Sequence, residues 1–242
     1  MKYNSLFVTG TDTGIGKTTV SCILAASLRR RGLRVGVFKP AETGCPEGNG
    51  AVGRVPQDVF KLKYFSGYEL PLESLCPYAL REPLAPMVAA RIEAVHVDLD
   101  RIEASHRRIA AAHDVTLIEG AGGLLVPLAE GASFVDLAKR LNAATLVVVG
   151  NRLGAINHAL LTIRHAQAAG LNVVGYILNQ LHAEIDLAAA TNIEVLAELL
   201  GPPLGIVPYV PALEPREEVR DQLSQIGTAR LLIESLLIPS QP

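Results

Sequence analysis

The chain has 242 residues, of which 49% are hydrophobic and 19% charged, and this composition suits a globular protein large enough to bury a full core. The formal net charge of −2 gives no electrostatic reason to expect a nucleic acid as a partner. No apolar run approaches the roughly 20 residues of a membrane span, and the chain begins with a strand pattern rather than a signal peptide. We therefore expect a cytoplasmic protein with no membrane partner.

Short apolar or β-branched runs alternate along the chain with stretches of helical periodicity. Strands are predicted at residues 6–9, 35–38, 115–119, 145–149, 173–178 and 205–207. Helices are predicted around residues 20–28 and at 86–94, 99–112, 134–142, 157–169 and 186–200, with another beginning near Asp58. This alternation predicts an α/β fold, in which a mostly parallel sheet carries helices on both faces. We expect one domain over residues 1–242, a mobile loop at 44–56 and a frayed tail after about residue 237.

The segment Gly10–Thr18, with the sequence GTDTGIGKT, joins the first predicted strand to the first predicted helix. A strand, a glycine-rich turn and a Lys-Thr pair at a helix start are the context of a phosphate-binding loop. Backbone N–H groups would hold the phosphates, Lys17 would reach the β- and γ-phosphates, and the Thr18 hydroxyl would ligate Mg²⁺. Five residues instead of the usual four separate Gly10 from Gly16, and the alternative is an ordinary tight turn. The segment predicts a site for a nucleoside triphosphate.

Charged side chains follow two other predicted strands, at the edge where ligands of parallel sheets collect. Lys39 follows the second strand and offers a second cation for a transferring phosphoryl group, the alternative being a surface lysine that lies over the sheet edge. Glu119 ends the next strand in the place of a Walker-B carboxylate, which helps to hold Mg²⁺. The alternative for Glu119 is a capping residue in the glycine-rich turn Gly120–Gly123. Asp58 needs no explanation beyond a helix cap.

Two later strand ends carry candidate ligand contacts. The helix that begins within Gly154–Asn157 would point free N–H groups outward, and these could hold a carboxylate. Asn179 follows the strand at 173–178, where its side-chain amide could read an adenine edge, the alternative being a local Asx turn. His158 is interpreted as a packed or capping residue rather than a catalytic base.

Taken together, these motifs resemble those of the dethiobiotin synthetase family, ATP-dependent carboxylases that close the ureido ring on the way to biotin. The phosphate loop of that family is also one residue longer than the common form. The matching motifs span most of the chain in the family's order, and they are Gly10–Thr18, Lys39–Gly44, Pro77–Pro86, Glu119–Gly123 with Val126–Leu128, and Leu153–Thr162.

The resemblance implies a reaction with ATP, CO₂ and 7,8-diaminopelargonate as substrates and Mg²⁺ as cofactor. One amine would be carboxylated to a carbamate, the carbamate would attack the γ-phosphate of ATP, and the neighbouring amine would close the ring. The products would be dethiobiotin, ADP and phosphate. Phosphoryl transfer of this kind asks a protein for positioning and charge rather than for a covalent nucleophile.

By position in the family's motifs, the resemblance implies a role for each matched residue. Lys17 and Lys39 would stabilise charge on the reacting groups, and Thr18, Asp58 and Glu119 would hold Mg²⁺. The implied ATP contacts are Gly14, Ile15, Gly16, Lys17, Thr18, Asp58, Glu119, Gly120, Ala121, Gly122, Asn179, Pro208, Tyr209 and Val210. The implied substrate contacts are Thr13 and Thr43 at the carbamate end, and Gly154, Ala155, Ile156 and Asn157 from the partner subunit of a homodimer.

Some positions depart from the family pattern. Gly14 stands where some members carry an acid, and Met87 stands where a histidine is expected. The loop at 45–57 is longer and poorer in acids than the family's usual run before the metal-binding aspartate, which is aligned here with Asp58.

Two other classes share the predicted fold. Partition and septum-positioning ATPases of the ParA and MinD kind use ATP as a dimerisation switch with a protein partner, but their signature lysine corresponds to Asp12 in this chain. The cobyrinate-type amide synthases usually continue into a glutamine-hydrolysing domain, and the residues after Pro211 are too few for one.

Overall fold

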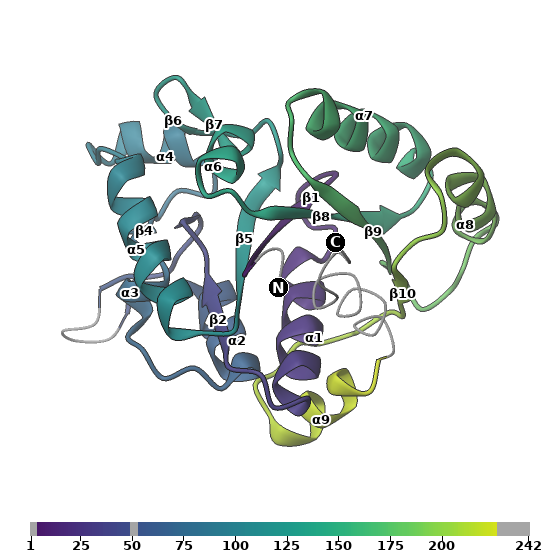
Figure 1. The fold of residues 1–242 in the computed structure, drawn as a ribbon, viewed down its shortest axis with the longest axis horizontal. Helices are drawn as coiled ribbons and strands as arrows, with labels where there is room; N and C mark the ends of the chain where they lie inside the picture. Colours follow the sequence, from purple (N-terminus) through teal and green to yellow (C-terminus); the bar gives the residue numbers. More distant parts are fainter. Residues whose placement is uncertain (1–3, 49–52, 227–242) are drawn as a thin grey trace, which may run out of the picture.

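The computed structural model describes residues 4–48 and 53–226, and a six-stranded parallel sheet forms its centre (Figure 1). The strand order is β10-β9-β8-β1-β5-β2, and every neighbouring pair is parallel. These strands are β1 (Ser5–Gly10), β2 (Val35–Phe38), β5 (Val115–Gly123), β8 (Ala144–Asn151), β9 (Val173–Gln180) and β10 (Gly205–Val207). All six predicted strands are confirmed. The predicted α/β class is confirmed with them.

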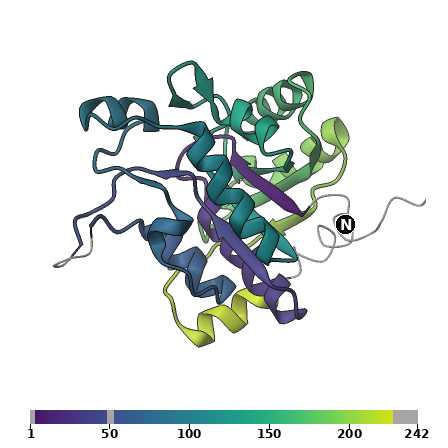
Figure 2. The ribbon, with the colours of Figure 1, turned by 60° about the vertical axis from the view of Figure 1, so that its left-hand side comes forward.

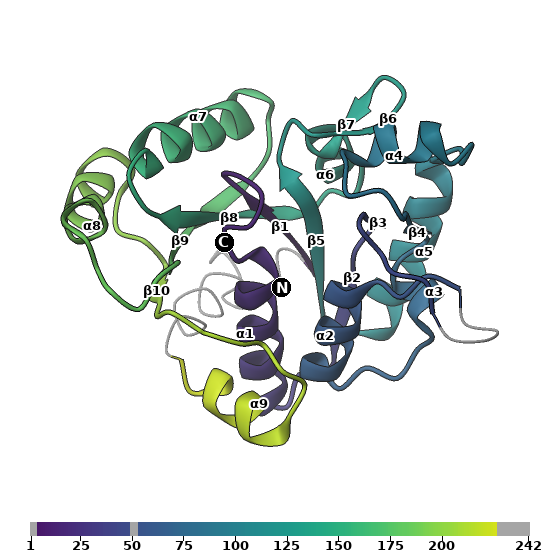
Figure 3. The same cartoon turned by 180° about the vertical axis from the view of Figure 1, so that it is seen from behind.

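Helices cover both faces of this sheet, as the alternation of elements predicts. On β8, Val147 and Val149 pack with α7, whereas Val148 belongs to the larger core cluster that contains the buried residues of α1. Helix α1 packs against both α2 and α9 (Figure 3). The helices are α1 (Lys17–Arg30), α2 (Gln57–Ser66), α3 (Leu72–Leu75), α4 (Pro86–Ile92), α5 (Leu99–Ala112), α6 (Phe134–Arg140), α7 (Ala155–Ala168), α8 (Leu187–Leu200) and α9 (Glu217–Ser224).

Among the described elements, the sequence analysis did not predict the helices α3 and α9 or four strands of two or three residues each. Strands β3 (Ala41–Glu42) and β4 (Tyr78–Ala79) form a parallel pair, and β6 (Pro127–Ala129) and β7 (Ala132–Ser133) form an antiparallel pair. Figure 2 shows the segment from β3 to α4, in blue, on the side of the molecule remote from α8. This segment lies beside the β2 edge of the central sheet, where α2 contacts β2, and the sequence predicted this helix to begin near Asp58.

Other predictions concern the ends of the chain and the loop at 44–56. Within that loop, Glu47 and Arg54 form an isolated antiparallel bridge, and the mobility of the loop stays a prediction. The predicted frayed tail after about residue 237 lies outside the described residues, and a single domain over residues 1–242 stays a prediction. No helix in residues 4–48 and 53–226 is long and apolar enough to cross a lipid bilayer.

The register of the sheet brings polar residues from different strands together. Phe7 of β1 and Phe38 of β2 both pair with Ile118 of β5. The next residue after Phe38 is Lys39, and the next after Ile118 is Glu119, so these two lie side by side at the carboxyl edge. Parallel strands all end at the same edge, and the phosphate loop that follows β1 lies there as well.

Candidate functional site

The loop between β1 and α1 has the backbone conformation that its glycines predict. Gly14 and Gly16 have φ angles of 73° and 86°, which is the left-handed region that side chains with a Cβ avoid. Gly16 is the N-cap of α1 and provides no side-chain cap, so the first-turn N–H groups of the helix stay available to an anion. A Cβ on Gly16 would lie 2.1 Å from Asn179 Nδ2. Only glycine therefore fits this position.

Lys17 begins α1 and folds back over the loop. Its Nζ donates a hydrogen bond to the backbone oxygen of Asp12 over 3.0 Å. Burial lowers the pKa of Lys17 to about 8, because the surrounding protein solvates the ammonium group less well than water does. A triphosphate in the loop would give the Lys17 ammonium group anionic oxygens as hydrogen-bond acceptors, in place of the neutral carbonyl oxygen of Asp12.

Four of the predicted site residues meet in one hydrogen-bonded cluster. Lys39 Nζ lies 2.6 Å from Asp58 Oδ2 and 2.6 Å from Glu119 Oε1. The Thr18 hydroxyl donates to the same Glu119 oxygen over 2.8 Å. Only 4% of the Lys39 side chain and 1% of the Glu119 side chain are exposed, so Lys39 is not a surface lysine. Asp58 does more than begin a helix, because its side chain bonds to Lys39.

The charges of the cluster stabilise one another inside the protein. Burial would lower the pKa of Lys39, but the charges of Glu119 and Asp58 outweigh it and hold that pKa above its usual value. Burial would likewise raise the pKa of Asp58, and the charge and hydrogen bond of Lys39 lower it instead. The lysine therefore stays a cation between two carboxylates.

The oxygen atoms of this cluster suit a small, hard cation. Glu119 Oε2 is buried and has no hydrogen-bond partner among the described residues, which leaves a carboxylate oxygen available for a ligand. No group of three or more acidic, histidine or cysteine side chains in the described ranges could hold a metal alone. Mg²⁺ typically binds through one or two carboxylates and substrate phosphates, so Thr18, Asp58 and Glu119 fit it in the presence of a nucleotide.

Glu42 belongs to the site, and the sequence analysis did not predict it. Its Oε1 accepts a hydrogen bond from the backbone N–H of Asp58 over 2.9 Å, and its Oε2 accepts one from Val59 over 3.1 Å. Burial raises the pKa of Glu42 to about 7. The sequence shows only that an acid, Glu42, stands three residues after Lys39. This position does not indicate that its carboxylate accepts a hydrogen bond from Asp58, 16 residues further on.

Most of the predicted contacts line one cavity of about 340 Å³ at the carboxyl edge of the sheet. Ile15 and Gly120 are predicted contacts that instead pack in the interior, where Ile15 is 2% exposed and a Cβ on Gly120 would lie 3.3 Å from the Phe7 ring. The lining residues are Thr13, Gly14, Gly16, Lys17, Thr18, Lys39, Glu42, Thr43, Asp58, Glu119, Ala121 and Gly122.

The residues predicted to bind adenine and the substrate carboxylate lie outside this cavity. Asn179 Nδ2 donates to the Ile15 backbone oxygen over 2.9 Å, so this amide supports the phosphate loop. Asn179 of β9 pairs with Val207 of β10. Pro208–Val210 follow Val207 directly in the sequence, so this segment begins beside Asn179. Gly154–Asn157 begins α7, and the preceding Arg152 forms a 2.6 Å ion pair with Asp12. Their predicted ligand contacts stay predictions.

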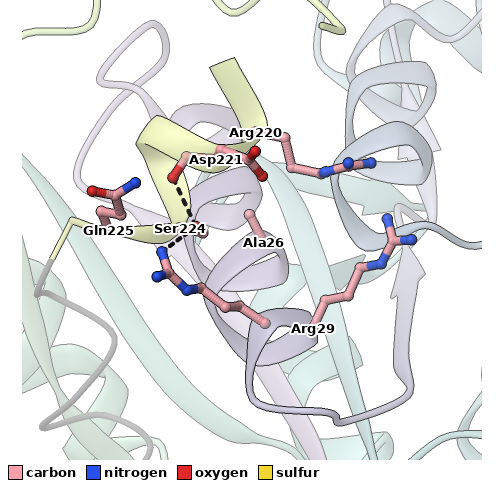
Figure 4. Close-up of a pocket in the computed structure, with 7 residues that line it drawn as sticks. Ala26, Arg29, Arg220, Asp221, Ser224 and Gln225 are labelled. Carbon is pink, nitrogen blue, oxygen red and sulfur yellow. Dashed lines mark hydrogen bonds between the residues drawn. The ribbon is translucent and has the colours of Figure 1, made fainter. Parts of the chain in front are cut away.

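A second cavity, of about 400 Å³, lies at the other end of α1 (Figure 4). It is lined by Arg29 and Arg30 at the end of α1 and by residues of α9, and Arg30 donates to the Ser224 hydroxyl over 3.2 Å. Helix α1 has 14 residues and is therefore about 20 Å long. The cavity is thus remote from the phosphate loop, and we assign the chemistry to the carboxyl edge of the sheet.

A glycine-rich loop between a strand and a Lys-Thr helix start, with a buried acid in the neighbouring strand, defines a P-loop nucleotide-binding protein. The family model described as "AAA domain" matches residues 4–217. The ATP-dependent dethiobiotin synthetase BioD of Anaeromyxobacter dehalogenans is 41% identical over 212 residues, which cover 87% of this chain and 92% of that protein. The synthetase of Thermodesulfovibrio yellowstonii is 37% identical and covers 96% and 97%. The chain belongs to the ATP-dependent dethiobiotin synthetase family and is therefore a ligase.

Solved structures of lower identity share the fold. The cell division protein complex MinC:MinD of Aquifex aeolicus matches with a TM-score of 0.55 and 15% identity, and the match covers 99% of this chain and 98% of that one. A ParA family ATPase of Chlorobium tepidum matches with a TM-score of 0.51 and 14% identity, covering 100% and 95%. At such identities the likeness extends to the fold alone.

Proposed function

We propose that this protein carries out the ring closure of biotin biosynthesis, in which 7,8-diaminopelargonate, CO₂ and ATP become dethiobiotin, ADP and phosphate. The observation that carries the proposal is the hydrogen-bonded cluster of Lys39, Asp58, Glu119 and Thr18 beside the phosphate loop. It supplies cationic and oxygen-donor groups at the point where a γ-phosphate would lie. The family supports this substrate, because its curated members carry the name dethiobiotin synthetase.

The phosphate loop would hold ATP through backbone N–H groups and through Lys17. Mg²⁺, bound by Thr18, Asp58 and Glu119 together with phosphate oxygens, would neutralise charge on the β- and γ-phosphates. Asn179 and Pro208–Val210 would lie at the adenine end. These assignments account for the open first turn of α1 and for the Glu119 oxygen that has no hydrogen-bond partner in the described part of the chain.

The chemistry proceeds through two displacements. An amine of the substrate first adds to CO₂ and gives a carbamate, with loss of a proton. A carbamate oxygen then attacks the γ-phosphorus, ADP leaves, and a carbamic–phosphoric anhydride forms. The second amine attacks the carbonyl carbon, phosphate leaves, and the ureido ring is closed. Lys17 and Lys39 would stabilise the negative charge on the phosphoryl and carbamate oxygens.

No covalent nucleophile is required for these steps, and the cysteines support that conclusion. Cys22, Cys45 and Cys76 are all buried. Burial raises the pKa of the Cys45 thiol to about 12 and raises that of Cys22 well above its ordinary value. Thiols of this kind are poor nucleophiles, because the thiolate is the reactive form.

The substrate would lie across a homodimer interface. Thr13 and Thr43 line the cavity and would contact the carbamate end, whereas the start of α7 in the partner subunit, at Gly154–Asn157, would receive the carboxylate. Leu153, which precedes this helix, is 84% exposed, and Leu161, the seventh residue of α7, is 62% exposed. A partner subunit that covers α7 would bury apolar surface of these side chains.

The proposal is tested by ADP and phosphate release from MgATP, with and without 7,8-diaminopelargonate and bicarbonate. The wild type is compared with Lys39→Ala, and product is identified by mass spectrometry. Turnover that requires both substrates, yields dethiobiotin and collapses in the variant is the expected result. Hydrolysis of ATP that is indifferent to both substrates and gives no dethiobiotin would refute the proposal and favour a switch ATPase.

A further inference from the structure

We propose that Glu42 is a positioning residue of the metal site, which holds the start of α2 so that Asp58 faces Lys39 and Glu119. The inference rests on the proposed role of Asp58 as a Mg²⁺ ligand. It begins from the position of Asp58, the second residue of α2, whose carboxylate can reach the cluster only if the first turn of the helix is fixed.

The first turn of α2 has no cap of its own. Its N-cap is Pro56, which has no side-chain hydrogen-bonding group and makes no side-chain cap. Early N–H groups of a helix lack partners within the helix and need acceptors from elsewhere. In α2, the carboxylate of Glu42 accepts from both Asp58 and Val59. Glu42 thus performs from a distant strand the task that a serine or aspartate N-cap usually performs.

Glu42 is itself held rigidly. It lies in β3, paired in register with Ala79 of β4, and its backbone oxygen accepts from Leu80 N over 2.8 Å. The residue is 6% exposed. Both oxygens of the carboxylate are thus committed to α2 from a fixed backbone, so the start of the helix is fixed relative to the strand that follows Lys39.

The chain between the two residues is itself held, by a hydrogen bond from Val55 N to Pro46 O and by the bonds of Arg54 to Ala79 O and Glu93. None of these bonds reaches the first turn of α2, whereas those of Glu42 do. Glu42, at one end of this connection, therefore binds the first turn of α2 at the other end. The same carboxylate also complements the positive end of the α2 dipole. Lys39, three residues before Glu42, and Asp58, at the start of α2, are brought within 2.6 Å of each other by this arrangement.

The test measures metal binding rather than turnover. Mn²⁺ replaces Mg²⁺ as the probe, a non-hydrolysable ATP analogue is present, and free Mn²⁺ is counted by electron paramagnetic resonance in the full-length protein. Loss of a group that orients a metal ligand typically weakens metal affinity by about 10- to 100-fold, and we expect this range for Glu42→Ala. Glu42→Gln keeps one carbonyl oxygen for the helix, so its Kd should lie between those of Glu42→Ala and the wild type.

The matched control is Asp98, whose side chain caps α5 by accepting from Asp100 N over 2.8 Å. Asp98→Ala also removes a helix cap, but α5 supplies no residue of the site, so its Kd for Mn²⁺ should equal that of the wild type. Thermal unfolding of each variant shows that the comparison is made between folded proteins.

The decisive comparison is made in an Asp58→Ala background. If Glu42 acts through Asp58, Glu42→Ala adds nothing further to the Kd once the Asp58 carboxylate is gone. An equal loss in both backgrounds, or a wild-type Kd in Glu42→Ala, would overturn the inference and leave the proposed function intact. Mn²⁺ binding that is indifferent to Asp58→Ala would instead remove the metal role of Asp58, and both proposals about this residue would fall.

Discussion

A hydrogen bond of 2.8 Å joins the Thr18 hydroxyl to Glu119 Oε1, although 101 positions separate the two residues along the chain. Thr18 lies in α1, which follows β1 through the phosphate loop, and Glu119 lies within the neighbouring strand β5, where it pairs with Val8 of β1. The phosphate loop and the acidic residue of β5 are therefore parts of one hydrogen-bonded unit, and the oxygen atoms that would hold a metal are already together.

The Thr18 hydroxyl can be removed with little change in shape. We expect Thr18→Val to weaken Mg²⁺-dependent ATP binding about tenfold, because one contact to a charged group is worth about 1.5 kcal/mol or more. Binding of ATP in the presence of a chelator should change much less. Calorimetric titration of the wild type and Thr18→Val with and without Mg²⁺ measures this, and an equal loss under both conditions would contradict the metal role of Thr18.

The buried ion pairs of Lys39 give a prediction about stability. Lys39→Met leaves Glu119 buried and without its cation, which should lower the free energy of unfolding by about 3–5 kcal/mol. Mg²⁺ should raise the melting temperature of this variant more than that of the wild type, since the carboxylates are then open to a metal. Chemical denaturation and thermal melts measure the two effects.

Lys139 provides the control for that experiment. It is exposed on α6, so Lys139→Met should change the free energy of unfolding by no more than about 0.5 kcal/mol. A Lys39→Met protein as stable as Lys139→Met would show that the buried pairs contribute nothing.

ATP binding should depend on pH through Lys17. Burial lowers the pKa of this lysine from 10.5 to about 8, so it loses its proton and its charge as the pH rises through that value. The phosphates of ATP favour the charged form. ATP affinity should therefore fall above about pH 8, by at most about tenfold per pH unit, and ATP binding there should take up protons. Calorimetry in buffers of different ionisation enthalpy counts these protons, and proton release would contradict the prediction.

The conformation of Gly16 predicts a site-specific cost for a single methyl group. In Gly16→Ala the residue would keep a left-handed backbone conformation that alanine disfavours, and its Cβ would clash with the side-chain amide of Asn179. Gly170 has a similar φ of 82° with nothing within 4 Å of the added Cβ, so Gly170→Ala should cost only the backbone term of about 1–2 kcal/mol. We expect Gly16→Ala to be less stable than Gly170→Ala and to lose ATP binding. Equal unfolding free energies would mean that Asn179 moves aside without cost.

The sequence predicted the parts of the site that depend on local pattern. A glycine-rich turn before a helix identifies Lys17 and Thr18, and an apolar run that ends in an acid identifies Glu119, because each signal lies within about ten residues of chain. Lys39 is identified by a local signal as well, because it directly follows the apolar run at 35–38.

The rest depends on contacts between distant segments. The hydrogen bond from Asp58 N to Glu42 joins residues 16 positions apart, and the one from Asn179 to the Ile15 backbone oxygen joins residues 164 positions apart. No spacing rule connects such residues. Strands β3 and β4 have two residues each, too few to show a period of two.

The pairing of Val8 with Glu119 has a consequence for how this chain can change in length. Successive side chains of a strand point to opposite faces, so one residue inserted between Val115 and Ile118 would turn Glu119 away from Thr18 and Lys39. An insertion in the exposed turn at Gly32 meets no such constraint, since that turn lies at the opposite ends of α1 and β2 from the site. Relatives that keep the chemistry should therefore differ in length at turns like this one and keep the count of residues from 115 to 119 unchanged.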